Sequence, residues 1–343
     1  MAASLFETRR MLRMLEQMLP PRTFLLDTFF RDIETSNEES VDIDIYKGKR
    51  RLAPFVSPKL AGVPVERRGF TTRTYKPPYI KPKMVFDAAH LPDRMPGQTI
   101  YTDAGSPAMR AAEQLRKDFA EMLDMVTRRE EWMAAQALNG GVITVVGEGV
   151  SDSIDFGMKS SHKITLTSGD RWTESTSDPL ADIRAWRRLG AQSSGLSPNV
   201  AVLGSGVIDA FLANAEVKDQ LDSRRADIGQ IAVQELPDGA TYLGSLFGGA
   251  IDLFGYDEWY VDPADDTEKP MVPVNKVFMG STRARTARHY GMIRDVEAGD
   301  AVARYFPKSW VDNDPSARWT MIQSAPLVVP HQIDAFLQIQ PIT

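Results

Sequence analysis

One segment, residues 47–83, constrains the possible folds of this chain more than any other. It reads KGKRRLAPFVSPKLAGVPVERRGFTTRTYKPPYIKPK, with eleven Lys or Arg residues and one acid, Glu66. Its six prolines exclude a helix and favour an extended backbone. Gly62 and Gly69 bracket a turn between two limbs, each of which can reach roughly 50–60 Å at about 3.3 Å per residue. The segment therefore predicts a long two-stranded arm.

Such an arm needs a surface beneath it, because an isolated two-stranded ribbon is marginally stable at best in water. The whole chain carries a net charge of −6, so the arm is a basic element of an acidic protein. The simplest surface to lie under it is another copy of the same chain. Residues 41–46 (VDIDIY) alternate strictly and are predicted to form a strand that leads into the arm, with residues 84–86 as its return.

The bulk composition is that of a globular protein with two or more subdomains. The chain has 343 residues, of which 43% are hydrophobic and 25% charged. It has no cysteine, which excludes disulfides and thiolate metal sites. Charges interrupt the N-terminal apolar residues and no apolar run could span a bilayer, so we expect a cytoplasmic chain with no membrane partner. A pI near 5.4 argues against a protein whose main task is to grip nucleic acid.

Two amphipathic helices are predicted in the first half of the chain. Residues 4–19 form a short one, either a packed terminal helix or an arm that docks on a neighbour or an assembly factor. Residues 106–138 form a long one, with a cap at Ser106, Pro107 in its first turn and Asn139-Gly-Gly as its end. Its polar face is predicted to be solvated or to face a neighbour, and it carries Arg110, Glu113, Lys117, Glu121, Asp124, Arg128 and Glu131.

The rest of the chain predicts an α+β fold, because strands alternate irregularly with two further helices. The helices begin at Asp178 and Ser205, and an acidic run at 257–268 is predicted to be an exposed loop. The expected strands are 142–146, 154–158, 163–167, 199–203, 250–256, 276–279, 319–324 and 336–339.

The common catalytic signatures are missing from the sequence. It has no GxxxxGK[ST], HExxH or GxSxG motif. The four histidines (His90, His162, His289 and His331) are scattered, and none has another at helical spacing. Each is more readily a surface or core residue than a ligand. We therefore expect no enzyme activity, no cofactor and no metal.

The C-terminal third carries a family resemblance. Residues 303–310 (ARYFPKSW), Asp314-Pro315 and residues 320–327 (TMIQSAPL) resemble the major capsid protein E family of tailed bacteriophages. The resemblance covers nearly the whole chain after about residue 22. Further matches in the same order are residues 79–83 (YIKPK), 91–93 (LPD), 178–179 (DP), 221–225 (LDSRR), 280–284 (GSTRA) and 290–291 (YG).

The resemblance implies the Hong Kong 97 capsid fold, with five parts. Residues 1–30 would be an N-terminal arm, and 31–100 a strand plus the extended loop. Residues 101–176 would hold the spine helix and peripheral domain, 177–285 the axial domain, and 286–343 the strands that return to the body.

The resemblance also implies a function. Copies of the chain would assemble into hexamers and pentamers of an icosahedral shell around phage double-stranded DNA. The expected partners are a decoration protein at three-fold sites, scaffold and portal proteins, and DNA in weak non-specific contact. The chain would reside in the virion, and in the host cytoplasm during assembly.

Contacts between subunits are expected to use the arm and the long helix. The candidate residues are Phe55, Arg67, Arg68, Phe70, Arg73, Tyr75 and Tyr79 of the arm, and Glu113, Glu121 and Glu131 of the helix as partners of its arginines. Three alternatives remain open: a nucleic-acid-binding protein that uses the arm, an encapsulin-type cargo shell, and a hydrolase in the axial region.

Overall fold

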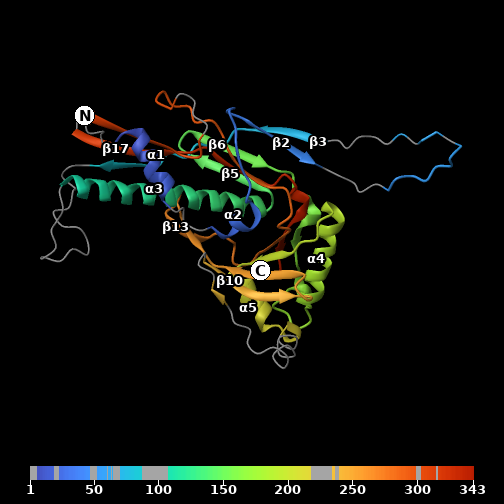
Figure 1. The fold of residues 1–343 in the computed structure, drawn as a ribbon. Coiled ribbons are helices and arrows are strands. Elements are labelled where there is room, and N and C mark those ends of the chain that lie inside the picture. The colour runs from blue at the N-terminus through green and yellow to red at the C-terminus, as the bar shows by residue number, and fades with distance from the viewer. Residues whose placement is uncertain are drawn as a thin grey trace.

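The structure is a computed structural model, and Figure 1 shows its arrangement around one long central helix. A protruding hairpin extends to one side, strands lie on one side of the helix, and a wedge of sheet and helices lies on the other. The described residues are 6–18, 23–46, 52–59, 61–62, 64, 70–86, 107–217, 234–235, 239–298, 303–313 and 316–343.

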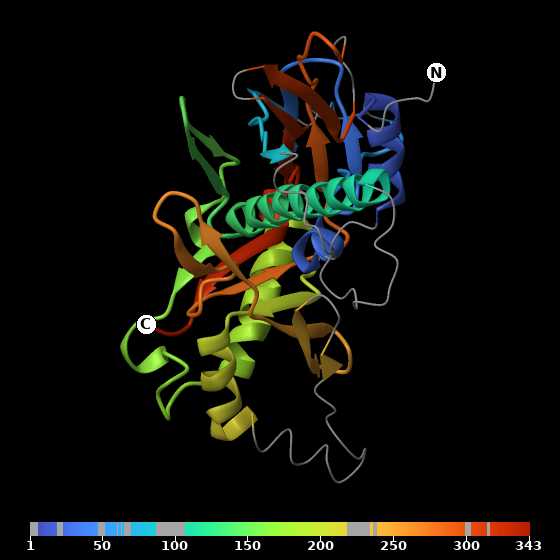
Figure 2. The ribbon, with the colours of Figure 1, turned by 90° about the vertical axis from the view of Figure 1, so that its left-hand side faces the viewer.

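The central helix α3 (Pro107–Leu138) confirms the long predicted helix. It ends where Gly140 and Gly141 adopt φ values of +89° and +73°, which side chains other than glycine rarely tolerate. The short hairpin of β5 (Val142–Gly147) and β6 (Val150–Asp155) follows it. Figure 2 shows α3 between the upper strands and the lower wedge.

The wedge is built on a seven-stranded mixed sheet in the order β7-β19-β14-β8-β11-β10-β9. Two of its neighbouring pairs, β7 with β19 and β8 with β11, are parallel, and the others are antiparallel. Its strands are β7 (Lys163–Thr165), β8 (Val200–Leu203), β9 (Gln234–Glu235), β10 (Ala240–Leu246), β11 (Ile251–Tyr256), β14 (Val277–Gly280) and β19 (Phe336–Gln340).

Alternation along the strands buries both faces of this sheet. In β8, Val200 and Val202 face one core, and Ala201 and Leu203 face the other. The second core is covered by α4 (Pro179–Ser194) and α5 (Ser205–Ala213). Asp178 caps α4, since its Oδ1 accepts hydrogen bonds from Leu180 N and Ala181 N at 3.0 and 2.8 Å, as predicted.

The N-terminal residues pack against α3. The helix predicted at 4–19 is present as α1 (Thr8–Gln17), and its Met11 and Leu15 join a core with Phe119 of α3. These contacts favour the packed terminal helix over the docking arm. The short α2 (Phe24–Phe29) buries its apolar residues in the main core, and β1 (Ile33–Thr35) follows.

The arm begins and ends in a regular ladder. β2 (Val41–Tyr46) confirms the predicted strand, and it pairs antiparallel with β3 (Phe70–Tyr75). The predicted return strand was wrong: residues 84–86 belong to β4 (Lys83–Phe86), which pairs with β17 instead. Residues 70–75 and 84–86 are both strands. Long-range pairing decides which of them is the partner of β2, and no local sequence pattern indicates that pairing.

The remaining strands complete two small sheets and a hairpin. The acidic run 257–268 is not a loop: it contributes most of the hairpin of β12 (Trp259–Asp262) and β13 (Thr267–Pro270). Lys269 forms ion pairs with two acids of the turn, and its Nζ lies 2.6 Å from Asp262 and 2.8 Å from Asp265. The two sheets are β1-β15-β18 and β16-β17-β4, formed with β15 (Ala287–Tyr290), β16 (Phe306–Asn313), β17 (Ser316–Gln323) and β18 (Pro326–Val329).

Candidate intersubunit contact surface

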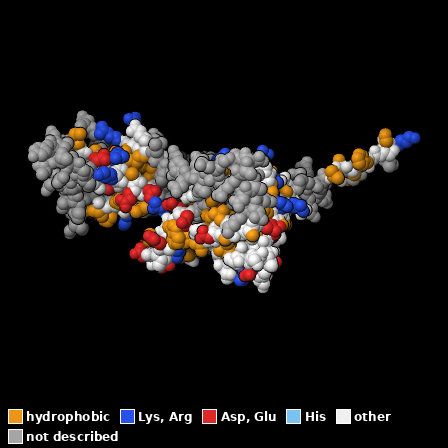
Figure 3. Space-filling model, turned by 90° about the horizontal axis from the view of Figure 1, so that it is seen from below, with side chains coloured by type: hydrophobic (Ala, Val, Ile, Leu, Met, Phe, Trp, Pro, Cys, Tyr) orange, Lys and Arg blue, Asp and Glu red, His pale blue; other side chains and the backbone are white. Residues whose placement is uncertain are grey.

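The protruding arm exposes apolar side chains that its own chain does not cover. Leu52 is 96% exposed and Phe55 fully so, and all described residues from 52 to 59 are exposed. Figure 3 shows these hydrophobic side chains gathered along the arm, well away from the body of the molecule. Soluble proteins rarely leave such groups together on a projecting segment unless a partner covers them.

The base of the arm is fixed to the body by two residues of β3. Arg73 Nη1 donates to the carbonyl of Asp155 at 2.6 Å, and the Tyr75 hydroxyl donates to the same oxygen at 2.5 Å. Tyr75 also packs edge-on against Phe156. Both residues orient the arm on its own chain, and their expected contact with a neighbouring subunit stays a prediction.

A second contact fixes the segment that follows β3. The Tyr79 hydroxyl donates to the carbonyl of Met292 at 2.7 Å and accepts from Arg294 N at 3.1 Å. Glu39 forms ion pairs with Lys76 and Arg294, and the Lys76 hydrogen bond lowers the pKa of Glu39. The arm therefore leaves the body at an angle that these contacts set.

Three predicted contact residues of the arm lie wholly or partly outside the described residues. Arg67 and Arg68 lie outside the described residues, and so does the side chain of Phe70 in β3. The side chain of Phe55 is described, and it is fully exposed.

The three predicted acids of α3 differ in their surroundings. Glu113 lies at the surface and pairs with Arg116 at 2.9 Å, which lowers the pKa of Glu113. Glu121 is exposed. Glu131 is only 2% exposed, so the prediction that it lies on the solvated face was wrong. It faces α2 and β11, which cover this part of α3.

Glu131 caps a helix from a distant part of the chain. Its Oε1 accepts from Leu25 N at 2.7 Å and its Oε2 from Leu26 N at 3.0 Å, the donors that a helix N-cap side chain ordinarily satisfies. The Tyr256 hydroxyl donates to Oε1 at 3.1 Å. Burial raises the pKa of Glu131 to about 7, although the three donors act in the opposite direction. This carboxylate joins α2, α3 and β11.

A neighbouring buried ion pair was also missed from the sequence. Glu130 is fully buried, accepts from the Tyr290 hydroxyl at 2.9 Å and pairs with Arg304 at 3.0 Å. Burial raises the pKa of Glu130, and Arg304 opposes that rise. A sequence signal existed, because Glu130 falls four residues after Val126 on the apolar stripe of α3. An acid at such a position indicates a buried partner.

The fold is that of phage capsid proteins of the Hong Kong 97 type. The chain superposes with a TM-score of 0.71 on a protein described as a prophage capsid protein of Escherichia coli CFT073, at 23% identity over 98% of this chain and 99% of that one. A phage-related protein from Bordetella bronchiseptica RB50 matches with a TM-score of 0.56 at 12% identity, over 99% and 98% of the two chains.

The chain belongs to the phage major capsid protein E family, whose model matches residues 7–340. The P21 prophage-derived major head protein of E. coli O6:H1 is 31% identical, over 98% of this chain and 99% of that one. The major capsid protein of Escherichia phage lambda is 30% identical over the same shares. The match includes α1, which the resemblance seen in the sequence did not cover.

The family makes this chain a major capsid protein, a structural component of the virion. No described helix combines the length and the apolar character needed to cross a membrane.

Proposed function

We propose that the arm of each subunit lies across a neighbouring subunit, and that copies joined in this way form the hexamers and pentamers of an icosahedral shell around phage double-stranded DNA. The observation that carries the proposal is the full exposure of Phe55, together with that of Leu52, on a segment outside the fold of its own chain. Relatives described as major capsid and head proteins support it.

Burial of the arm supplies the driving force. Covering Leu52 and Phe55 gains about 1.5–3 kcal/mol each, before the entropic cost of association. A shell repeats this contact in every subunit, so a modest gain per arm stabilises the whole assembly.

Charges of the arm set the register of docking. Single exposed ion pairs contribute about 0–1 kcal/mol, but many together orient two surfaces as they approach. Arg67 and Arg68 act in this way on carboxylates of the adjacent subunit, with Glu121 and Glu113 of α3 as partners. Glu131 takes no part, because its carboxylate is buried within its own subunit. Arg73 serves first to orient the arm on the hairpin of β5 and β6.

The five parts of the capsid fold map onto the chain as follows. Residues 1–30 form the N-terminal arm and 31–100 the strand with the extended loop. Residues 101–176 carry the spine helix and peripheral domain, 177–285 the axial domain, and 286–343 the return strands. The second core beneath α4 and α5 contains no described residue of α3, and this supports an axial unit with a core of its own.

The net charge of −6 suits a container whose DNA must enter and leave, so contacts with DNA are few and non-specific. A decoration protein at three-fold sites, a scaffold and a portal complete the assembly, which takes place in the host cytoplasm.

Substitutions of Phe55 test the proposed contact between the arm and a neighbouring subunit. The F55D variant places a charge where the arm must be desolvated, so it should accumulate as soluble, folded subunits or capsomers without closed shells. The matched F55L variant keeps an apolar side chain and should form normal shells. Negative-stain microscopy and sedimentation of both variants measure the outcome, with circular dichroism to verify folding. Closed shells from F55D at the yield of F55L would refute the proposal.

A further inference from the structure

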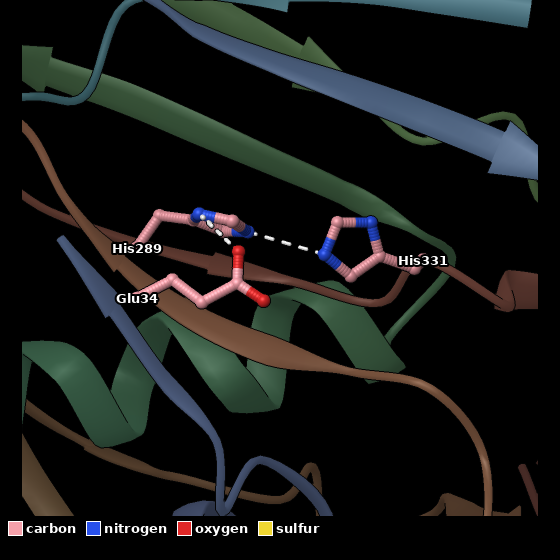
Figure 4. A group of neighbouring side chains, drawn as sticks. All are labelled: Glu34, His289 and His331. Atoms are coloured by element: carbon pink, nitrogen blue, oxygen red, sulfur yellow. Dashed lines mark hydrogen bonds and ion pairs between the residues drawn. The ribbon is translucent and has the colours of Figure 1, made fainter. Parts of the chain in front are cut away.

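Two histidines and a glutamate that are far apart in the sequence meet at the sheet β1-β15-β18. Glu34 of β1 is the direct cross-strand neighbour of His289 in β15, in parallel register. His331 follows β18, which pairs with the other edge of β15. Three separate segments thus bring their side chains to one point (Figure 4).

The geometry of these side chains resembles a set of metal ligands. The Nε2 atoms of His289 and His331 face each other at 3.1 Å, and both side chains are about 5–6% exposed. Two imidazole nitrogens bound to one tetrahedral zinc ion would lie about 3.3 Å apart. A carboxylate oxygen of Glu34 lies 3.5 Å from Nδ1 of His289, and one ligand atom from each residue lies within 4.8 Å of the others.

The carboxylate of Glu34 contacts the ring nitrogen of His289 that does not face His331. The carboxylate of Glu34 favours a proton on Nδ1 of His289, which leaves the Nε2 lone pair directed at His331. Metal-binding histidines commonly have such a carboxylate behind them.

We propose that Glu34, His289 and His331 form a binding site for one divalent transition-metal ion, with Zn²⁺ as the best fit. The two Nε2 atoms bind the ion. Glu34 is half exposed, and its carboxylate either turns to become the third ligand or orients His289 through Nδ1. Imidazole nitrogens with a carboxylate suit Zn²⁺ and disfavour Mg²⁺, which prefers oxygen ligands.

The ion has a route to the site. A hollow of about 460 Å³ opens beside His289 and is lined by the acids Glu34, Glu38 and Asp42. Their charges attract a cation, and water from the hollow can fill a remaining coordination position. The positive charge of Arg285 also acts on His289 and partly offsets the negative charge of Glu34.

The ion would cross-link the N-terminal part of the subunit to its body. β1 is three residues long, and all three are exposed. In this cysteine-free chain, a metal bridge from β1 to β15 and the segment after β18 would serve the clamping role that a disulfide serves elsewhere.

Zinc alone is the probe for the test. Purified full-length protein is stripped with EDTA, dialysed against Zn²⁺ and analysed for bound metal and melting temperature. Wild type should bind one Zn²⁺ per chain and melt at a higher temperature with Zn²⁺ but not with Mg²⁺. H331Q should lose the site, and E34Q should bind about 10–100-fold more weakly.

The control is H90Q, which removes the histidine that lies outside the described residues and should bind zinc as wild type does. If H331Q does not fold, the comparison of wild type with E34Q decides. Wild type that binds no zinc, or E34Q with unchanged zinc affinity and H331Q with unchanged stoichiometry, would overturn the proposal. Co²⁺ bound with the visible spectrum of a tetrahedral site would support it.

Discussion

Replacing Glu131 with alanine should destabilise the subunit strongly, and by an amount that depends on pH. The substitution leaves Leu25 N, Leu26 N and the Tyr256 hydroxyl without their acceptor. A buried donor without a partner costs about 1–3 kcal/mol, and water entering the vacated space would recover part of this. We expect a loss of about 4 kcal/mol at pH 5.

The sign of the pH dependence follows from the raised pKa of Glu131. A pKa of about 7 in the folded state, against 4.5 in the unfolded chain, means that the folded state binds the proton more tightly. The resulting stability is fully present below pH 4.5 and is lost as pH rises through 7, by about 3 kcal/mol. Alanine cannot titrate, and about 2.5 kcal/mol of this loss falls between pH 5 and pH 8, so the cost of E131A should shrink to about 1.5 kcal/mol at pH 8.

Urea unfolding of unassembled subunits, followed by tryptophan fluorescence at pH 5 and pH 8, measures both effects. The matched control is E121A, which removes an exposed carboxylate from the same helix and should change stability by less than about 0.5 kcal/mol. Hydrogen exchange at the amides of Leu25 and Leu26 should accelerate in E131A only. An E131A variant as stable as E121A at pH 5, or a cost that grows with pH, would refute the reasoning.

Two further substitutions probe the core by denaturant unfolding. R304M leaves the carboxylate of Glu130 buried without its cation and should cost about 3 kcal/mol, whereas the double variant with E130M should recover most of that loss. A double variant no better than R304M would contradict this account of the pair. G190A places a Cβ 2.6 Å from Pro198 Cγ and should cost about 1–3 kcal/mol. G147A, where nothing lies within 4 Å, is its control, and equal losses from the two would show that the contact with Pro198 is unimportant.

Local signals in the sequence were sufficient for several elements. The bounds of α3 follow from the proline at its start, the glycines at its end and one apolar face. The cap at Asp178 identified the start of α4. The basic segment 47–83 indicated the arm only in part: its described residues 52–59 are exposed, but Pro77 is buried, and Tyr79 and Ile80 bond to the body.

The pairing of strands could not be predicted locally. Residues 70–75 and 84–86 are both β-like, and only the partner offered by β17 decides that the second is no part of the arm. The hairpin of β12 and β13 was predicted as a loop for a related reason. Its charges indicated exposure correctly, but exposed residues can also form a ladder when Lys269 offsets the acids.

Buried polar groups were the hardest to foresee. Glu131 has a polar side chain on a helix that carries both exposed and buried acids, and its burial depends on α2, which lies more than a hundred residues earlier. The grouping of His289 with His331 depends on the pairing of β15 with β18. Sequence spacing between two histidines reports metal geometry on one helix but not across strands.

The position of β19 also determines when the seven-stranded sheet can be completed during synthesis. β7 pairs with β19, and β19 lies between β7 and β14, although it is translated after every other strand of that sheet. A nascent chain therefore cannot close the sheet until residue 340 has left the ribosome. Subunits that are still being translated therefore lack a finished wedge.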